Sequence, residues 1–201
     1  MLLVETFVLG PIETNCYLAY DGETGEGILI DPAVYDKGVA DFISSKGITV
    51  KYTVNTHGHY DHIGGDNDFG YPVIIHEADA GFLGDPVKNL AIMMGYSMPG
   101  IDPARVVRDG DSVYVKGLAF KVIDTPGHTP GSMALECEGS LFTGDTLFCE
   151  GIGRTDIPFA DTRDIEKSVE KLMRYSDNTV IYPGHGPAST IGHERDHNPF
   201  L

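Results

Sequence analysis

The first third of the chain alternates short apolar runs with turn residues, a pattern typical of β-strands. Apolar runs at 2–9, 16–20 and 27–30 are separated by Gly10-Pro11 and Asp21-Gly22, so three strands are predicted. Between residues 35 and 46 the apolar spacing changes to that of a helix, and Gly47 follows where a helix is expected to end. A further β-branched run at 48–54 predicts the next strand.

The rest of the chain repeats this plan. Strands are predicted at 71–75, 112–115, 119–125, 133–136, 141–143 and 179–182, with a helix at 161–175. Shorter helices are predicted at 61–69 and 77–83, and we interpret Gly64-Gly65 as a place where the backbone passes close to a bound metal. We therefore expect an α/β fold in one domain of residues 1–201, with two facing sheets and the helices outside.

Residues 84–104 are the least regular part of the sequence. They contain Met93, Met94, Tyr96 and Met98 but few charges. Methionine and tyrosine adapt to apolar ligands, so a flexible lid over a substrate is one interpretation. A loop whose methionines fill the edge of the core is the other, and the sequence leaves both open.

Charge and cysteine content exclude several classes of partner. The formal net charge is −16, whereas binding to nucleic acid or to an anionic membrane needs a basic surface. No apolar run is as long as a membrane span, and the N-terminus lacks the pattern of a signal peptide. Cys16, Cys137 and Cys149 are odd in number and far apart, as in a reduced chain. We therefore expect a cytoplasmic protein that acts on a small molecule, with no nucleic-acid or membrane partner.

The stretch Thr56-His57-Gly58-His59-Tyr60-Asp61-His62 carries the strongest chemical signal. It places three imidazoles and one carboxylate directly after a predicted strand. His57 and His59 are two apart in an extended turn and can point the same way, whereas Asp61 and His62 come where a helix would begin. Imidazole and carboxylate at this density suit zinc, iron or manganese. The motif therefore predicts ligands for two metal positions.

Three later turns repeat one arrangement, in which a ligand-type residue follows a strand next to glycine or proline. These residues are His128, Asp145 and His185. Each turn alone is a weak signal, because a single histidine is more often not a ligand. Together with the first motif they provide five histidines and two aspartates, a number that suits two divalent cations sharing one carboxylate and one water.

At these residues the chain resembles the metallo-β-lactamase fold superfamily and, more closely, its glyoxalase II-like hydrolases. The matching motifs are T-H-G-H-Y-D-H at 56–62, P-G-H-T-P-G-S at 126–132, G-D-T-L-F at 144–148 and P-G-H-G-P at 183–187, with G-R-T-D at 153–156. The resemblance implies an αββα four-layer sandwich with a dinuclear metal site. By motif position, one metal would be held by His57, His59 and His128, the other by Asp61, His62 and His185, and both would be bridged by Asp145.

The resemblance also implies a reaction. A hydroxide held between the metals would attack a thioester of the S-lactoylglutathione type, with Asp61 acting both as ligand and as the group that orients the hydroxide. Zinc is the expected pair of ions, with iron or manganese as alternatives. A persulfide dioxygenase with one iron, and a lactonase or esterase, are alternative functions of the same site. An inactive binding module is a further alternative, which the complete set of ligands argues against.

Some features depart from the glyoxalase II pattern. Those enzymes carry a C-terminal helical domain that supplies basic residues to the glutathione carboxylates, whereas this chain stops at Leu201. Lys88 or Arg154 could substitute, although Asp156 is close enough in sequence to pair with Arg154. Asp145 stands where the zinc-dependent β-lactamases have cysteine, which argues against a β-lactamase. His193 and His197, in the polar tail, are interpreted as hydrogen-bonding residues, and the oligomeric state stays open.

Overall fold

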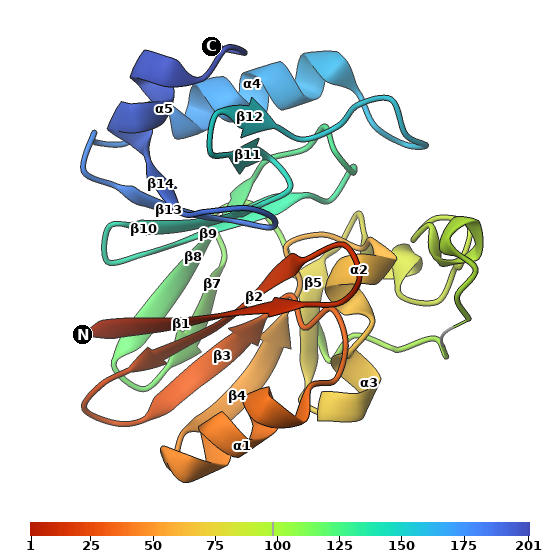
Figure 1. Cartoon of the computed structure of the whole chain (residues 1–201), viewed down its shortest axis with the longest axis vertical. Coiled ribbons are helices and arrows are strands. Elements are labelled where there is room, and N and C mark those ends of the chain that lie inside the picture. Colours follow the sequence, from red (N-terminus) through yellow and green to blue (C-terminus); the bar gives the residue numbers. More distant parts are fainter. Residues whose placement is uncertain (98) are drawn as a thin grey trace.

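Two mixed β-sheets pack face to face in the computed structural model, which describes residues 1–97 and 99–201 (Figure 1). Strands of the first sheet follow chain order: β1 (Leu2–Leu9), β2 (Thr14–Asp21), β3 (Glu26–Ile30), β4 (Thr49–Val54), β5 (Val73–His76) and β6 (Arg105–Val107). The first three strands pair antiparallel, and β3 to β6 pair parallel. Parallel strands end at one edge of a sheet, so the loop after β4 starts from that edge.

The second sheet has the order β14 (Ser189–Thr190), β13 (Val180–Pro183), β10 (Ser140–Gly144), β9 (Met133–Cys137), β8 (Leu118–Asp124) and β7 (Ser112–Val115). Only β10 and β13 pair parallel, while their neighbours pair antiparallel. Because β9 runs antiparallel to both β8 and β10, strands β8, β10 and β13 all point the same way. Their C-terminal ends therefore share one edge. A short hairpin of β11 (Leu147–Phe148) and β12 (Gly151–Ile152) follows β10.

Helices cover the outer faces of both sheets (Figure 1). The first sheet is flanked by α1 (Lys37–Ser45), α2 (Tyr60–Ile63) and α3 (Asp66–Phe69), and the second by α4 (Thr162–Leu172) and α5 (Ile191–His197). Asp36 and Asp161 cap α1 and α4 by accepting hydrogen bonds from backbone N–H groups in the first turn. Within the described part of the chain, no helix is long and apolar enough to cross a membrane.

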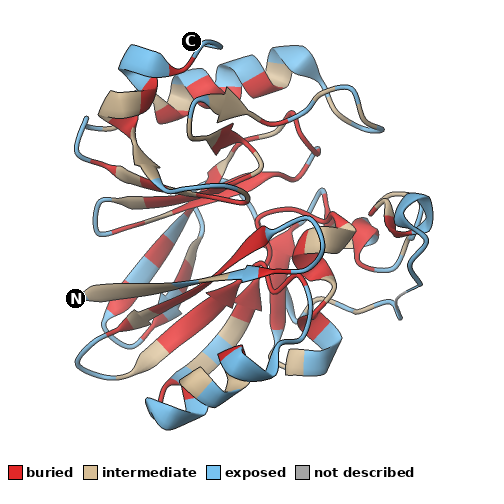
Figure 2. Cartoon of the chain, viewed as in Figure 1, coloured by how far each residue is buried: buried red, intermediate tan, exposed pale blue. Residues whose placement is uncertain are grey.

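The core lies mainly between the sheets, where the buried residues concentrate (Figure 2). Strand β2 shows why the central strands are apolar along their whole length. Its Tyr17 and Ala19 face the second sheet, whereas Cys16 and Leu18 face the outer helix α1. A strand buried on both faces loses the alternation of apolar and polar positions. The predicted α/β sandwich with two facing sheets and outer helices is confirmed.

Two local predictions were wrong. Residues 61–69 form two short helices, α2 and α3, rather than one. A Cβ at Gly64 would clash with the carbonyl of Ala33, and one at Gly65 with the carbonyl of Pro32, so the packing of that loop requires these glycines. This packing accounts for the two glycines independently of a metal, and their close approach to a metal stays a prediction. In the predicted helix at 77–83, only Ala80–Phe82 is helical, as a 3₁₀ turn.

Candidate metal centre

Four strand ends deliver the predicted site residues to one edge of the sandwich. After β4 the chain turns through His57 and His59 and enters α2, which carries Asp61 and His62 in its single turn. The other three side chains follow the C-terminal ends of β8, β10 and β13, which share an edge as described above. Seven predicted side chains thereby converge from distant parts of the sequence: His57, His59, Asp61, His62, His128, Asp145 and His185.

The first group consists of three histidines. Nδ1 of His59 lies 3.0 Å from Nε2 of His57 and 2.9 Å from Nε2 of His128. All three side chains are buried. Three imidazole nitrogens around one point match the donor set of a zinc or iron position.

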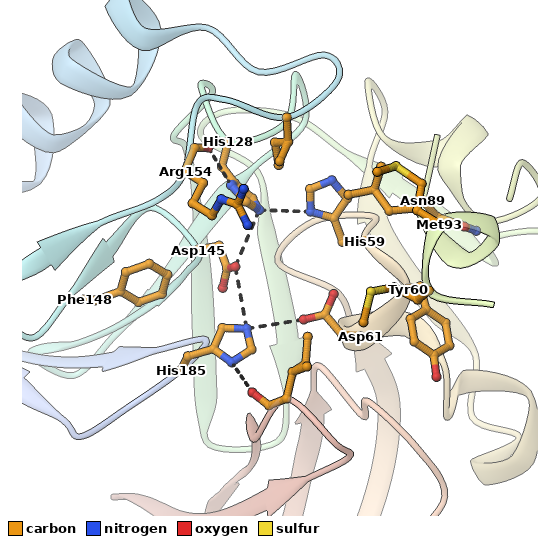
Figure 3. Close-up of a pocket in the computed structure, with 14 residues that line it drawn as sticks. His59, Tyr60, Asp61, Asn89, Met93, His128, Asp145, Phe148, Arg154 and His185 are labelled. Atoms are coloured by element: carbon orange, nitrogen blue, oxygen red, sulfur yellow. Dashed lines mark hydrogen bonds and ion pairs between the residues drawn. The ribbon is translucent and has the colours of Figure 1, made fainter. Parts of the chain in front are cut away.

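The second group mixes a carboxylate with two histidines. Oδ2 of Asp61 lies 3.2 Å from Nε2 of His62 and 3.3 Å from Nε2 of His185. Asp145 stands between the two groups, because its Oδ1 is 3.3 Å from Nε2 of His62 while its Oδ2 is 3.5 Å from Nε2 of His128. Figure 3 shows it between His128 and His185. The structure thus brings the seven residues together in the two predicted groups, with Asp145 placed to be shared.

Hydrogen bonds on the far side of the rings set which nitrogen faces the centre. Nδ1 of His128 lies 3.0 Å from the carbonyl oxygen of Arg154, and Nδ1 of His185 lies 3.1 Å from that of Ile12. A carbonyl oxygen can only accept, so both Nδ1 atoms must carry the proton. In a neutral ring, the Nε2 atoms that face the centre then present lone pairs, as a metal ligand must.

The centre also contains buried polar atoms without hydrogen bonds. Among the described residues, Nε2 of His62 and Oδ1 of Asp145 are two such atoms, and both face the second group. Leaving buried polar atoms unpaired is costly, and a bound cation would satisfy them. Together with the orientation of the rings, this shows that the residues present fit a divalent metal.

Burial and charge act differently on the two groups. Burial, reinforced by the other imidazoles, lowers the pKa of His57 well below its usual range and that of His59 to about 3, which keeps both rings neutral. For His62, burial opposes the charged form, but the carboxylates of Asp61, Asp145 and Asp31 outweigh it and raise the pKa. Burial would raise the pKa of Asp61, yet the nearby His62 and His185 hold it well below its ordinary value.

Two buried aspartates that the sequence analysis did not identify support the centre. Asp31 accepts hydrogen bonds from the backbone N–H of Thr56 and, at 3.0 Å, from Nδ1 of His62. Asp79 joins the two histidine turns, because it accepts from the N–H of Gly58 on one side and from the N–H of Gly131 on the other. A single aspartate after a strand looks like an ordinary turn residue, so neither aspartate could be recognised from its local sequence.

A cavity of about 410 Å³ opens over the centre (Figure 3). Arg154 lines it and forms a bidentate ion pair with Asp156 at 2.8 and 3.0 Å, as the short sequence separation of the two predicted. Among the described lining residues, Arg154 supplies the one lysine or arginine charge, and Lys88 does not line the cavity. Apart from the polar groups, the walls are apolar, formed by Ile12, Tyr60, Leu90, Met93, Met94, Phe148 and Ile157.

The irregular segment 84–104 forms part of this cavity. Leu90, Met93 and Met94 line it, which fits the interpretation of the segment as a lid over a substrate, whose flexibility stays a prediction. Ala91 is buried, and Met93 is 71% exposed, so the methionines do not simply fill the core. The prediction for Met98 falls outside the described residues.

Comparison with known proteins agrees with this geometry. The family model of the metallo-beta-lactamase superfamily matches residues 9–185. An uncharacterized protein of Mycobacterium tuberculosis is 36% identical, over 100% of this chain and 98% of that protein. Hydroxyacylglutathione hydrolase GloC of Haemophilus influenzae is 34% identical, over 98% of this chain and 97% of that enzyme.

Two solved structures are similar over nearly the whole chain. The B3 metallo-beta-lactamase BLEG-1 superposes with a TM-score of 0.92 and 34% identity, covering 99% of both chains. The protein TTHA1623, solved in a di-iron-bound form, superposes with a TM-score of 0.86 and 32% identity, covering 98% of this chain and 100% of that one. The fold, the site and these likenesses agree: the chain belongs to the metallo-β-lactamase superfamily.

Proposed function

We propose that this chain is a dinuclear metal-dependent hydrolase that cleaves thioesters of the S-lactoylglutathione type. The observation that carries the proposal is the convergence of six ligand-type side chains, in two groups of three, on either side of a seventh, Asp145. The 34% identity to a hydroxyacylglutathione hydrolase supports this substrate class.

The two groups divide the work of holding the ions. Asp145 would bridge, since its Oδ1 faces His62 of the second group while its Oδ2 lies 3.5 Å from Nε2 of His128 of the first group and 3.7 Å from Nε2 of His185 of the second. When bound, a pair of divalent cations lowers the pKa of a shared water to near neutral and polarises the carbonyl of the substrate. One ion would be held by His57, His59 and His128, and the other by Asp61, His62 and His185.

Asp61 is the chain's own candidate for orienting the nucleophilic water. Its Oδ2 faces both His62 and His185 and accepts a hydrogen bond from Oγ1 of Thr14 at 3.4 Å. The same side chain lines the cavity, so it reaches the space where substrate must lie. A carboxylate in this position can accept a proton of the attacking water and fix the water's orientation. The thiolate that departs needs little protonation, so no separate general acid is required.

The cavity walls bear on the choice of substrate. Phe148 and Met93 offer apolar surface to an acyl group, and Arg154 offers one guanidinium to a carboxylate on the thiol carrier. Arg154 already pairs with Asp156, and both side chains are more than 70% exposed, so this ion pair is weak enough to exchange with a substrate carboxylate. We therefore expect a thioester whose carrier presents at least one carboxylate.

The test measures metal content per chain and three activities on the same sample. At least two metals per chain with hydrolysis of S-lactoylglutathione would support the proposal. One iron per chain with oxygen uptake on glutathione persulfide would favour a dioxygenase instead. The third activity to assay is hydrolysis of a β-lactam, because BLEG-1, at 34% identity, is a B3 metallo-beta-lactamase. This likeness weakens the argument from Asp145 against β-lactamase activity.

A substitution sharpens the test. His59→Ala removes the nitrogen at the centre of the first group, so we expect metal content to fall and hydrolysis to decrease by at least about 100-fold. His197→Ala, which removes an imidazole from α5, is the matched control and should leave both unchanged. Full retention of metal and hydrolysis in His59→Ala would contradict the proposal.

A further inference from the structure

A second cluster of metal-ligating side chains, made of Cys149, Glu150 and His193, shares no residue with the centre described above. One ligand atom from each of the three residues lies within 4.8 Å of the others. We propose that this cluster is a separate site for zinc or a similar thiophilic divalent cation. We refer to it as the hairpin site.

The backbone holds Cys149 and Glu150 in place. They form the two-residue turn between β11 and β12, where Phe148 pairs with Gly151. Glu150 has a φ of 56°, in the left-handed region that the second central residue of a tight turn can adopt. A two-residue turn leaves little freedom, so the cysteine and glutamate side chains project from a fixed point.

A buried glutamate clamps this turn onto helix α5. Glu194 is fully buried, and its Oε2 accepts a hydrogen bond from the N–H of Glu150 at 2.7 Å. Asn198, the residue that follows this helix, donates to the carbonyl of Gly151 at 3.1 Å and to Glu194 at 2.9 Å. His193 precedes Glu194 in α5, so the contacts that fix the turn also fix its distance from the imidazole.

The orientation of the imidazole is set as well. Nε2 of His193 lies 3.0 Å from Oε1 of Glu150. The ring stacks on that of His197, with centroids 4.5 Å apart and planes inclined by 13°. Because the ring is held on one face and at one nitrogen, it points toward the turn.

The donor set matches zinc. Thiolate, imidazole and carboxylate are its usual protein ligands, and three of them leave a fourth position for water. Cys149 is partly exposed, whereas Cys16 and Cys137 are buried, so it is the thiol that an ion in solution can reach. Burial and the carboxylates of Glu194 and Glu150 raise the pKa of the Cys149 thiol, so a bound cation has to displace the thiol proton. The same carboxylates add negative charge that favours a cation at this position.

The alternative is that the cluster binds no metal and is an exposed ion pair between His193 and Glu150, with a cysteine nearby by chance. Such an exposed ion pair would contribute little to the stability of the fold and would not need a thiol beside it. A direct signal separates the two, because the seven residues of the dinuclear centre include no cysteine. Cadmium bound through sulfur produces a thiolate-to-metal charge-transfer band in the ultraviolet, so this band reports on the hairpin site alone.

The experiment titrates cadmium into protein whose dinuclear centre is already loaded with its own metals. We expect one equivalent of the charge-transfer band, which zinc then suppresses by competition. Cys149→Ser should abolish the band although both buried cysteines remain. Glu150→Gln keeps the hydrogen bond to His193 but removes the charge, and it should weaken cadmium binding by about tenfold.

A matched pair of variants tests the histidine. His193→Ala should weaken cadmium binding by at least about tenfold, whereas His197→Phe, which keeps a ring to stack on His193, should keep the stoichiometry and the band. A band that survives in Cys149→Ser, a wild-type protein without any band, or equal affinities for the two histidine variants would each overturn the proposal. Because the readout is spectroscopic and uses the loaded protein, it does not depend on which substrate the dinuclear centre hydrolyses.

Discussion

Asp31 accepts a hydrogen bond from Nδ1 of His62 at 3.0 Å, and both side chains are almost completely buried. The other nitrogen of His62 faces Asp61 and Asp145 in the second ligand group. A carboxylate behind an imidazole fixes the tautomer and makes the nitrogen on the opposite side of the ring a more basic ligand for a metal. The end of β3 therefore controls a ligand on α2, although the two are far apart in sequence.

Replacing Asp31 by asparagine should weaken metal binding without unfolding the chain. Asparagine tolerates the left-handed backbone at this position, where φ is 50°, but it has one acceptor oxygen in place of two. We expect metal affinity at the second group to fall about 10- to 100-fold, as for other residues that support metal-bound histidines. Equilibrium dialysis against a competing chelator measures this loss. The exposed Asp68→Asn is the control, and equal affinities for the two variants would contradict the prediction.

Gly184 lies so close to the metal centre that even one added carbon atom would displace a ligand. A Cβ at this position would clash with Oδ1 of Asp145 and would lie 2.8 Å from Cε1 of His62. Gly184→Ala should therefore displace the carboxylate placed to be shared by the two groups, with loss of at least one metal per chain and at least about a 100-fold loss of hydrolysis. Gly84→Ala is the matched control, because no atom lies within 4 Å of the Cβ it would add. Full metal content in Gly184→Ala, measured by elemental analysis, would show that the shared carboxylate is not needed.

Asp79 ties together two turns that each carry a histidine of the first group. Its oxygens accept from the N–H of Gly58, the N–H of Gly131 and the hydroxyl of Thr129. Asp79→Asn replaces one acceptor by a donor, so at least one buried N–H loses its partner, and we expect the free energy of unfolding to fall by about 1–3 kcal/mol. Chemical denaturation measures this change, with the exposed Glu77→Gln as control. A stability equal to that of the control would mean that the two turns are positioned by other contacts.

The elements that the sequence predicted well are those with a strong local pattern. The strand at 2–9 and the strand at 112–115 agree residue for residue with β1 and β7. Helix α5 was missed because it is short and mostly polar, and it docks through the apolar Ile191 and the buried Glu194. Strands β6, β11, β12 and β14 have two or three residues each, which is too few for a hydrophobic period to be seen.

The site divides in the same way. His57 and His59 could be predicted from the sequence because several ligand-type residues lie close together in one turn. Asp31 and Asp79 act through contacts 21 to 52 residues away in the chain, so no local pattern reveals them. The hairpin site was missed for the same reason, since His193 lies far from Cys149 in sequence and looked like a residue of a polar tail.

Asp66 allows a test of how burial alone changes stability with pH. Its side chain is buried with Asn55 as hydrogen-bond donor, and burial raises its pKa well above the ordinary value. Above the unfolded-state pKa of about 3.9, the unfolded chain releases this proton while the folded chain retains it. The folded state then binds more protons, so the contribution of Asp66 to the free energy of unfolding falls as pH rises.

Asp66→Asn replaces the carboxyl group by an amide that does not titrate, so the folded state no longer has to bind a proton at this position. The free energy of unfolding of the variant, relative to that of the wild type, should therefore increase from about pH 5 to pH 8. The difference between the two proteins should be smallest near pH 5. We expect a melting temperature at least about 2 °C above that of the wild type at pH 8, which corresponds to somewhat less than 1 kcal/mol for a chain of this length. Asp68→Asn, which removes an exposed carboxylate two residues away, should follow the wild type at every pH. Parallel melting curves for Asp66→Asn and the wild type across this range would show that the buried carboxyl group does not bind the extra proton.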